Sequence, residues 1–171
     1  VSASIALLKK SNCFTVTTGH QLNIFTGPLY SIYKIATTIK LAQELAVMHP
    51  DNFFIPVFWM ATEDHDFEEI NHTSIFGKQV TWNRPAGGAV GRFNLEGLAQ
   101  VLDEVKTILG SDVDCLKFFE EAYLRSDTLA EATRKIIHSL FGEYGLVVID
   151  GDDAELKRLF VGEMHGDIFE N

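Results

Sequence analysis

The sequence predicts an α/β fold in which a parallel sheet carries helices on both faces. Two runs, Phe53–Trp59 and Leu146–Asp150, are apolar without polar alternation, which is typical of strands that helices cover on both sides. The predicted order of strand, helix, strand, excursion, strand and helix is that of α/β domains. Pro56 interrupts the first apolar run, so we expect a bulge or a sheet edge at this position.

The first fifty residues predict the end of a helix, a strand and a long helix. Ile5–Lys10 has the pattern of a helix end, and Cys13–Thr18 is a β-branched and aromatic run that ends at Gly19. Apolar residues then recur at helical spacing after Pro28. They are Leu29, Ile32, Tyr33, Ala36, Ile39 and Leu45. This pattern predicts a helix of about five turns.

A hairpin and a group of helices are predicted between the second and third strands. The hairpin joins His72–Phe76 to Gln79–Trp82 through Gly77 and Lys78. Helices are predicted at Leu95–Leu109, Val113–Leu124 and Thr128–Phe141. After the third strand, Asp152 and Glu155 are expected to cap a helix that runs to about Phe160. We therefore expect one domain over residues 1–171, with an inserted segment at about 72–141.

The composition limits the classes of partner. The chain has 24 acidic and 14 basic residues, a net charge of −10, and no basic stripe that could follow a nucleic acid backbone. Its longest strongly apolar stretch, Phe53–Ala61, is about half the length that a bilayer crossing needs. Cys13 and Cys115 are far apart, which favours neither a disulfide framework nor a thiolate zinc site. We expect a cytoplasmic protein that binds neither nucleic acid nor membrane.

The first candidate site lies between the first strand and the long helix. It contains Thr18, Gly19, His20 and Gln21, followed by Thr26 and Gly27. In a parallel sheet this is the carboxyl end of a strand, where ligands bind. The glycines permit close backbone approach, the helix start favours an anion, and the histidine can stabilise developing negative charge. The alternative is that Gly27 and Pro28 form a turn and His20 is a surface or capping residue.

The second candidate site follows the strand at Phe53–Trp59. Four ionisable residues stand in succession there, namely Glu63, Asp64, His65 and Asp66. Neighbouring carboxylates raise one another's pKa and attract cations, so this segment could supply a base, an ammonium site or metal ligands. The alternative is a solvated loop that caps the next helix. A metal site would also need His72, and the spacing matches no metal motif, so no metal is predicted.

A third set of residues is less specific. Asn71 follows the acidic segment, and Arg84 and Arg92 flank a glycine-rich loop from which an arginine could hold a carboxylate or phosphate. The alternative is ordinary loop solubility, which is our interpretation for Arg92 and stays open for Arg84. Asp150 ends the last strand, where a carboxylate could reach a ribose hydroxyl or, with Asp152, cap the next helix.

Several longer strings carry a resemblance. They are Thr18-Gly19-His20-Gln21, Phe25-Thr26-Gly27-Pro28-Leu29-Tyr30, Tyr33-Lys34, Pro56-Val57-Phe58-Trp59, Glu63-Asp64-His65-Asp66-Phe67, Glu69-Ile70-Asn71 and Leu146-Val147-Val148-Ile149-Asp150. Together they resemble the bacillithiol biosynthesis cysteine-adding family over most of the chain, least over residues 95–141. Members are longer, so the resemblance implies an N-terminal core fragment of a homodimeric parent. It also implies a Rossmann-like core similar to that of class I aminoacyl-tRNA synthetases.

The resemblance implies a ligase that joins the carboxyl group of cysteine to the amine of glucosaminyl malate in the last step of bacillithiol biosynthesis. By analogy with the synthetases, ATP or another adenine nucleotide would activate the carboxyl group. His20 and Thr18 would contact phosphate or the activated carboxyl. Asp64 and Asp66 would hold an amine, and His65 would accept its proton. The second histidine of the synthetase signature is replaced here by the run at residues 22–24.

The remaining predicted contacts are to substrate or nucleotide. They come from Gly19, Gln21, Thr26, Gly27, Glu63, Asn71 and Arg84. Two other functions stay open at this point. One is a nucleotide- or sugar-binding module without catalysis, and the other is a metal-dependent hydrolase that uses the segment Glu63–His72.

Overall fold

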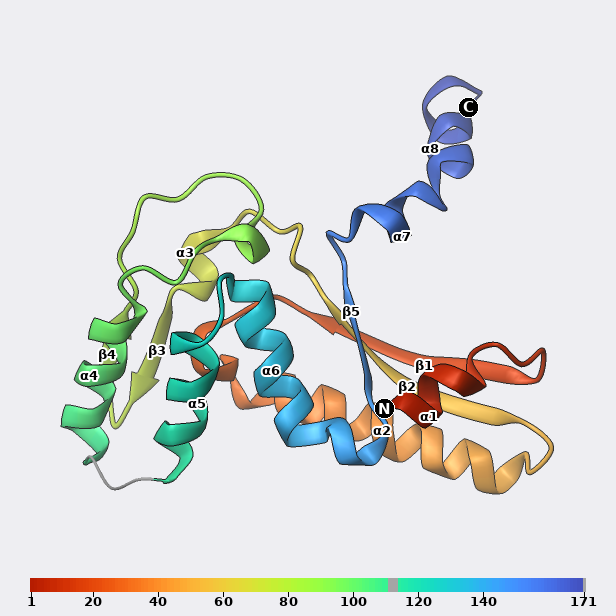
Figure 1. The fold of residues 1–171 in the computed structure, drawn as a ribbon, viewed down its shortest axis with the longest axis horizontal. Helices are drawn as coiled ribbons and strands as arrows, with labels where there is room; N and C mark the ends of the chain where they lie inside the picture. The colour runs from red at the N-terminus through yellow and green to blue at the C-terminus, as the bar shows by residue number, and fades with distance from the viewer. Residues whose placement is uncertain (111–113, 171) are drawn as a thin grey trace.

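The computed structural model describes residues 1–110 and 114–170, and within these ranges the central sheet has three parallel strands (Figure 1). They are β1 (Cys13–His20), β2 (Phe53–Met60) and β5 (Val147–Asp150), in the order β1-β2-β5. The register pairs His20 with Met60, and Met60 with Asp150. The carboxyl ends of all three strands therefore meet at one edge, and the predicted α/β class is confirmed.

Helices cover both faces of this sheet, as predicted. On one face, α2 (Leu29–Met48) packs on β1 and β2, and α6 (Leu129–Phe141) packs on β5. The other face has a smaller apolar cluster of Ile55, Val57 and Val147, which α1 (Ser2–Leu7) covers through Leu7. The larger core lies under α2 and α6 and continues into the inserted segment.

Two predictions about the strands were wrong. Gly19 does not end β1, because it pairs with Trp59 and the strand continues to His20. Pro56 makes no bulge, because β2 is the central strand and keeps an unbroken register with β1. The missing N–H of Pro56 is tolerated because Phe53 N and Ala61 N both donate towards the β1 side. The alternation of strands turns Pro56 to the other side, just before the pairing with β5 begins at Val57.

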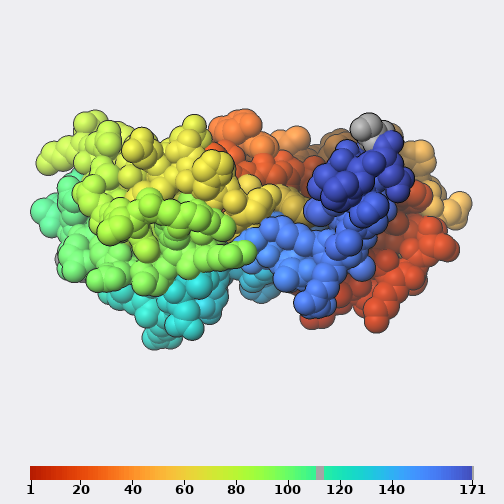
Figure 2. All heavy atoms as spheres, turned by 90° about the horizontal axis from the view of Figure 1, so that it is seen from above, coloured from red at the N-terminus to blue at the C-terminus, as the bar shows by residue number. Residues whose placement is uncertain are grey.

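The inserted segment forms one end of the molecule, as Figure 2 shows from above. In chain order it contains α3 (Phe67–Ile70), β3 (His72–Ile75), β4 (Lys78–Thr81), a 3₁₀ turn at Val90–Arg92, α4 (Leu98–Leu109), α5 (Asp114–Leu124) and α6. The hairpin turn is Phe76–Gly77, one residue earlier than predicted, and both residues have positive φ. The helix predicted to start at Leu95 is α4, which starts at Leu98. The predicted helix start at Val113 lies outside the described residues.

The chain ends in two short helices that project from the body in Figure 1. They are α7 (Ala154–Arg158) and α8 (Val161–Phe169), where one helix to Phe160 was predicted. The cap of α7 is Asp153, whose Oδ1 accepts hydrogen bonds from the backbone N–H groups of Glu155 and Leu156 at 2.8 and 3.1 Å. The prediction that Asp152 caps this helix was wrong, because that carboxylate forms ion pairs instead. No helix in the two described ranges combines the length and apolarity of a membrane span.

Candidate functional site

The first and second candidate sites come together at the carboxyl edge of the sheet. The link is Gln21, which follows β1 and whose Nε2 donates hydrogen bonds of 2.8 Å to both Asp64 Oδ2 and Glu69 Oε2. Asp64 belongs to the loop after β2, and parallel strands end at the same edge, so the pairing of β1 with β2 brings the two loops together. The side-chain amide of Gln21 fixes the two loops to each other.

His20 is the most unusual side chain of this edge. Its Nε2 is buried and has no hydrogen-bond partner among the described residues, which is costly for a polar atom. The ring meets the edge of Tyr30 at 5.6 Å between centroids. Burial and then the nearby Lys34 ammonium lower the pKa of His20 below its ordinary 6.5. The imidazole is therefore neutral at pH 7 and can donate one hydrogen bond and accept another.

Lys34 and Tyr30 were not predicted as site residues, although both stand in strings that carry the family resemblance. They lie one helical turn apart on α2. The Lys34 ammonium donates to the Gly19 carbonyl at 2.5 Å and sits 5.2 Å from the Tyr30 ring centroid. It has no carboxylate partner within the described part of the chain, so its charge is available to an anionic group. With Thr18, the two side chains line a groove of about 350 Å³ along the outer edge of β1.

The segment between β1 and α2 is strained. Phe25, Thr26 and Gly27 have φ values of 51°, 68° and 64° in succession, and only glycine adopts such values readily. The segment is held by Phe25 N–H, which donates to the hydroxyl of Tyr123 at 2.6 Å, and by Ser31 Oγ, which donates to the carbonyl of Thr26 at 2.7 Å. Strain that surrounding contacts maintain is typical of functional sites.

Asp64 organises the loop after β2. Its Oδ1 accepts hydrogen bonds from the backbone N–H groups of His65 and Asp66, at 2.7 and 3.0 Å. The Asp66 N–H, followed by the Gln21 amide, lowers the pKa of Asp64 below its ordinary 3.8. The expected mutual raising of carboxylate pKa values is thus absent at Asp64, which is ionised at neutral pH.

The other residues of this loop divide between structure and solvent. Asp66 caps α3 by accepting the Glu69 N–H at 3.3 Å, so the capping alternative holds for this residue. His65 is exposed next to Asp64. Glu63 lies over Gly151, where an added Cβ would overlap its Oε2 and come within 2.7 Å of Trp59 Nε1. The Glu63 carboxylate therefore faces the turn after β5.

Replacing Asp64 with Ala is expected to lower the free energy of unfolding by about 1–2 kcal/mol, because three hydrogen bonds are lost. The pKa of Asp64 in the folded protein is lowered below 3.8. Its contribution to the free energy of unfolding is therefore complete above pH 3.8 and disappears as the pH falls through the pKa of the folded state. Urea titrations at pH 7 and at acid pH measure both effects. Asp103→Ala, an exposed carboxylate on α4, is the control and should change stability by less than about 0.5 kcal/mol. Equal effects of the two substitutions would refute this role for Asp64.

A second network ties β5 to the loop after β2. The buried hydroxyl of Thr62 donates to Asp150 Oδ1 and accepts the Asp152 N–H at 2.8 Å. Asp152 also pairs with Arg92 at 2.5 Å and Lys157 at 2.6 Å, and these two cations, in that order, lower its pKa. Arg92 therefore forms a specific ion pair with Asp152, rather than contributing only to the solubility of the loop. In this structure Asp150 Oδ1 accepts hydrogen bonds that stabilise the turn after β5.

Two predicted binding residues lie away from His20. Arg84 donates to the backbone carbonyl and side chain of Asn94, and its guanidinium stacks 4.5 Å from the Phe93 ring centroid. It lines a separate polar cavity of about 470 Å³. Asn71 lies at the start of the hairpin, where its Oδ1 is 3.1 Å from His72 Nδ1. Neither residue lines the cavity next to His20.

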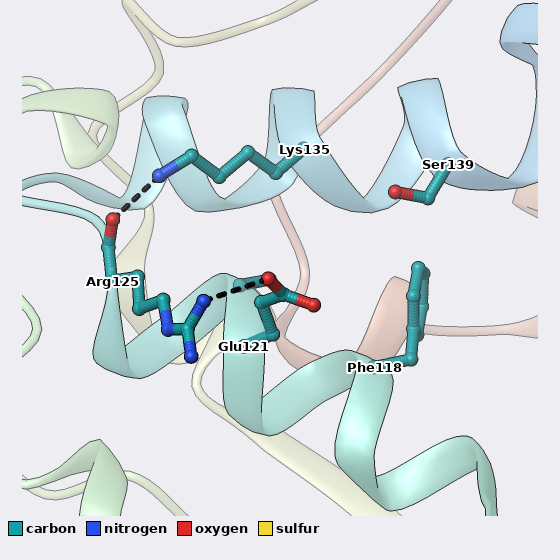
Figure 3. Close-up of a pocket in the computed structure, with 6 residues that line it drawn as sticks. Phe118, Glu121, Arg125, Lys135 and Ser139 are labelled. Carbon is teal, nitrogen blue, oxygen red and sulfur yellow. Dashed lines mark hydrogen bonds and ion pairs between the residues drawn. The ribbon is translucent and has the colours of Figure 1, made fainter.

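A further cavity, of about 260 Å³, lies between α5 and α6 (Figure 3). Its cations are already paired within the protein. Arg125 binds Glu121 at 3.0 Å, and Lys135 donates to the Arg125 carbonyl at 2.5 Å and pairs with Glu131 at 2.9 Å. Across residues 1–110 and 114–170, no three His, Cys, Asp or Glu side chains gather in a way that could hold a metal ion.

Comparisons with known proteins agree with the resemblance seen in the sequence. Residues 1–171 match the family described as bacillithiol biosynthesis BshC, N-terminal Rossmann-like domain. A protein of Flavobacterium johnsoniae named "Putative cysteine ligase BshC" is 54% identical over 92% of this chain. Proteins of the same name from Cytophaga hutchinsonii and Salinibacter ruber are 50% and 38% identical over 99% and 91% of the chain. The chain spans 30–31% of the length of these three relatives.

Proposed function

Because the chain belongs to the bacillithiol biosynthesis BshC family, as its N-terminal Rossmann-like domain, we propose that the longer protein containing it joins cysteine to glucosaminyl malate. The observation that carries this proposal is His20 at the carboxyl end of β1, with a buried and unpartnered ring nitrogen. A ligase must stabilise negative charge on the carboxyl group that it activates. His20 supplies a hydrogen-bond donor, and the Lys34 ammonium, which has no carboxylate partner in the described part of the chain, supplies a positive charge for that purpose.

The proposed reaction forms an amide between the carboxyl carbon of cysteine and the amine of glucosaminyl malate. We propose ATP as the co-substrate: a carboxylate oxygen of cysteine attacks the α-phosphorus, the bond between the α- and β-phosphates breaks, and an acyl adenylate and pyrophosphate form. The amine then attacks the carbonyl carbon, the bond to the adenylate oxygen breaks, and the amine loses a proton. Lys34 and His20 fit this chemistry because an ammonium and an imidazole N–H both bind anionic oxygens.

The remaining roles follow from where each side chain lies. Thr18 shares the outer groove of β1 with Lys34, so we assign it to binding of the activated group, whereas Thr26 lines only the small cavity of about 20 Å³ beside His20. His65 is exposed next to Asp64, and we assign it as the acceptor of the amine proton. We assign Asp64 and Asp66 to attraction of the incoming ammonium, and Gln21 to alignment of the two loops.

The test is amide formation by the purified full-length protein with cysteine, glucosaminyl malate and ATP. Mass spectrometry should detect bacillithiol together with AMP, and His65→Gln should slow the reaction by about 100-fold at pH 7. His138→Gln, an exposed histidine on α6, is the matched control and should retain full activity. Binding of glucosaminyl malate without product, in the presence of ATP, would favour a binding module and overturn the proposal.

A further inference from the structure

The hydroxyl of Tyr123 connects the inserted segment to the turn between β1 and α2. Tyr123 stands on α5 and is 2% exposed, and its hydroxyl accepts the N–H of Phe25, 98 positions away in the sequence, at 2.6 Å. The two rings also meet edge to face, at 5.4 Å between centroids. Burial raises the pKa of Tyr123, so the hydroxyl is neutral at pH 7. A side chain of the insertion therefore binds the backbone of this turn directly.

The contact with Tyr123 falls where the backbone conformation is least favourable. Phe25 and Thr26 have φ values of 51° and 68°, which an aromatic or β-branched residue adopts only when surrounding contacts hold it there. Loss of the Tyr123 hydroxyl would remove the acceptor of the Phe25 N–H, a costly change for a partly buried donor. The turn could then relax towards negative φ.

The turn also sets the position of α2 relative to the end of β1. Ser31, in the first turn of α2, donates to the carbonyl of Thr26 at 2.7 Å. Next to it, the ring of Tyr30 meets the ring of His20 at 5.6 Å between centroids. One helical turn further on, the ammonium of Lys34 donates to a carbonyl at the end of β1. Relaxation of the turn would therefore move two side chains of α2 relative to His20.

We propose that Tyr123 is a positioning residue for the candidate site, because its hydroxyl holds the turn at Phe25 and Thr26 and thereby fixes α2 against the end of β1. Tyr123 lines neither the groove along β1 nor the cavity beside His20, so it acts only through the turn. The inserted segment thus supports the site from a distance. The effect of Tyr123 on ligation rests on the proposed function, whereas its effect on the turn and on α2 does not.

The experiment compares wild type, Tyr123→Phe and Val57→Ala in the full-length protein by NMR. Val57 is buried in the apolar cluster on the other face of the sheet, so its truncation lowers stability without changing the turn. Tyr123→Phe should speed amide hydrogen exchange at Phe25 about tenfold more than Val57→Ala does, as expected for one lost hydrogen bond. It should also shift the ring signals of His20, because the ring of Tyr30 moves.

Kinetics of ligation separate positioning from stability. Tyr123→Phe should lower kcat about tenfold and change KM for cysteine less than twofold, whereas Val57→Ala should keep kcat within twofold of the wild type. Tyr144→Phe removes an exposed hydroxyl and should match the wild type in every measurement. The wild type alone provides a further test, since strong cross-peaks between the amide and Hα protons within Phe25 and within Thr26 mark positive φ.

Three results would overturn the proposal. They are a negative φ at Phe25 in the wild type, exchange and His20 signals in Tyr123→Phe that equal those of Val57→Ala, and an unchanged kcat of Tyr123→Phe in an active protein. The wild-type spectrum decides the first of these even if a variant does not fold. A full-length protein with the expected spectra and no ligation activity would refute the proposed function and leave the placement of the turn by Tyr123 standing.

Discussion

Replacing His20 with Gln will lower the rate of bacillithiol formation by the full-length protein by about 100-fold or more. Loss of a positioned donor to developing negative charge costs a factor of this size. Gln carries one amide group and cannot reproduce the two nitrogens of the imidazole ring. Single-turnover assays at saturating cysteine, glucosaminyl malate and ATP measure the effect. His49→Gln, an exposed histidine at the end of α2, is the control.

The same substitution should leave the fold intact. The pKa of His20 is lowered, so between the folded pKa and 6.5 the unfolded chain binds more protons than the folded chain. Stability of the wild type therefore rises with pH across this window and is lost as the pH falls through it. His20→Gln should remove that part of the pH dependence in urea titrations. A variant with full activity, or one that does not fold at pH 7, would contradict the role given to His20.

Replacing Gly27 with Ala is expected to destabilise the protein by about 3 kcal/mol, through backbone strain and overlap. Gly27 has φ 64° and ψ −145°, which lies near a region almost restricted to glycine. An added Cβ would also overlap Asn23 Cβ and come within 2.6 Å of its Cγ. Because the same strained segment carries Thr26 into the His20 cavity, activity should fall together with stability.

Gly166→Ala is the matched control for Gly27→Ala. Gly166 lies inside α8, and an added Cβ would meet nothing within 4 Å. Alanine is the better helix former by about 1 kcal/mol, so this variant should be as stable as the wild type or slightly more stable. Urea-induced unfolding followed by circular dichroism compares the two. A Gly27→Ala protein within about 0.5 kcal/mol of the wild type would show that the strain at this turn is not required.

The strands could be predicted from the sequence because burial on both faces leaves a continuous apolar run. That signal predicted strands at Phe53–Trp59 and Leu146–Asp150, and the structure confirms them as β2 and β5 of a parallel sheet. Pro56 and Gly19 misled the prediction, since their effect depends on which neighbour each backbone group faces. Such information exists only once the strand order and register are known. The helix predicted to run to about Phe160 corresponds to α7, and α8 was not predicted. The cap of α7 was misassigned because Asp152 and Asp153 are competing helix caps in the sequence.

The candidate site could be predicted where the strands themselves carry it. His20 ends β1 and Asp64 follows the neighbouring parallel strand, so their shared edge follows from topology, and Gln21 links the two loops. Lys34 could not be found in this way. It stands on α2, and its approach to His20 depends on how this helix packs on the sheet. Arg84 is occupied by Asn94 and Phe93, contacts that a loop sequence does not reveal.

The central claim is that this domain serves bacillithiol formation through His20. The most direct measurement is mass spectrometry of thiols in cells that lack the full-length gene, complemented with wild type, His20→Gln or the control His49→Gln. We expect deletion to abolish bacillithiol while glucosaminyl malate accumulates, with rescue by wild type and His49→Gln but not by His20→Gln. Unchanged bacillithiol in the deletion strain, or full rescue by His20→Gln, would contradict the account.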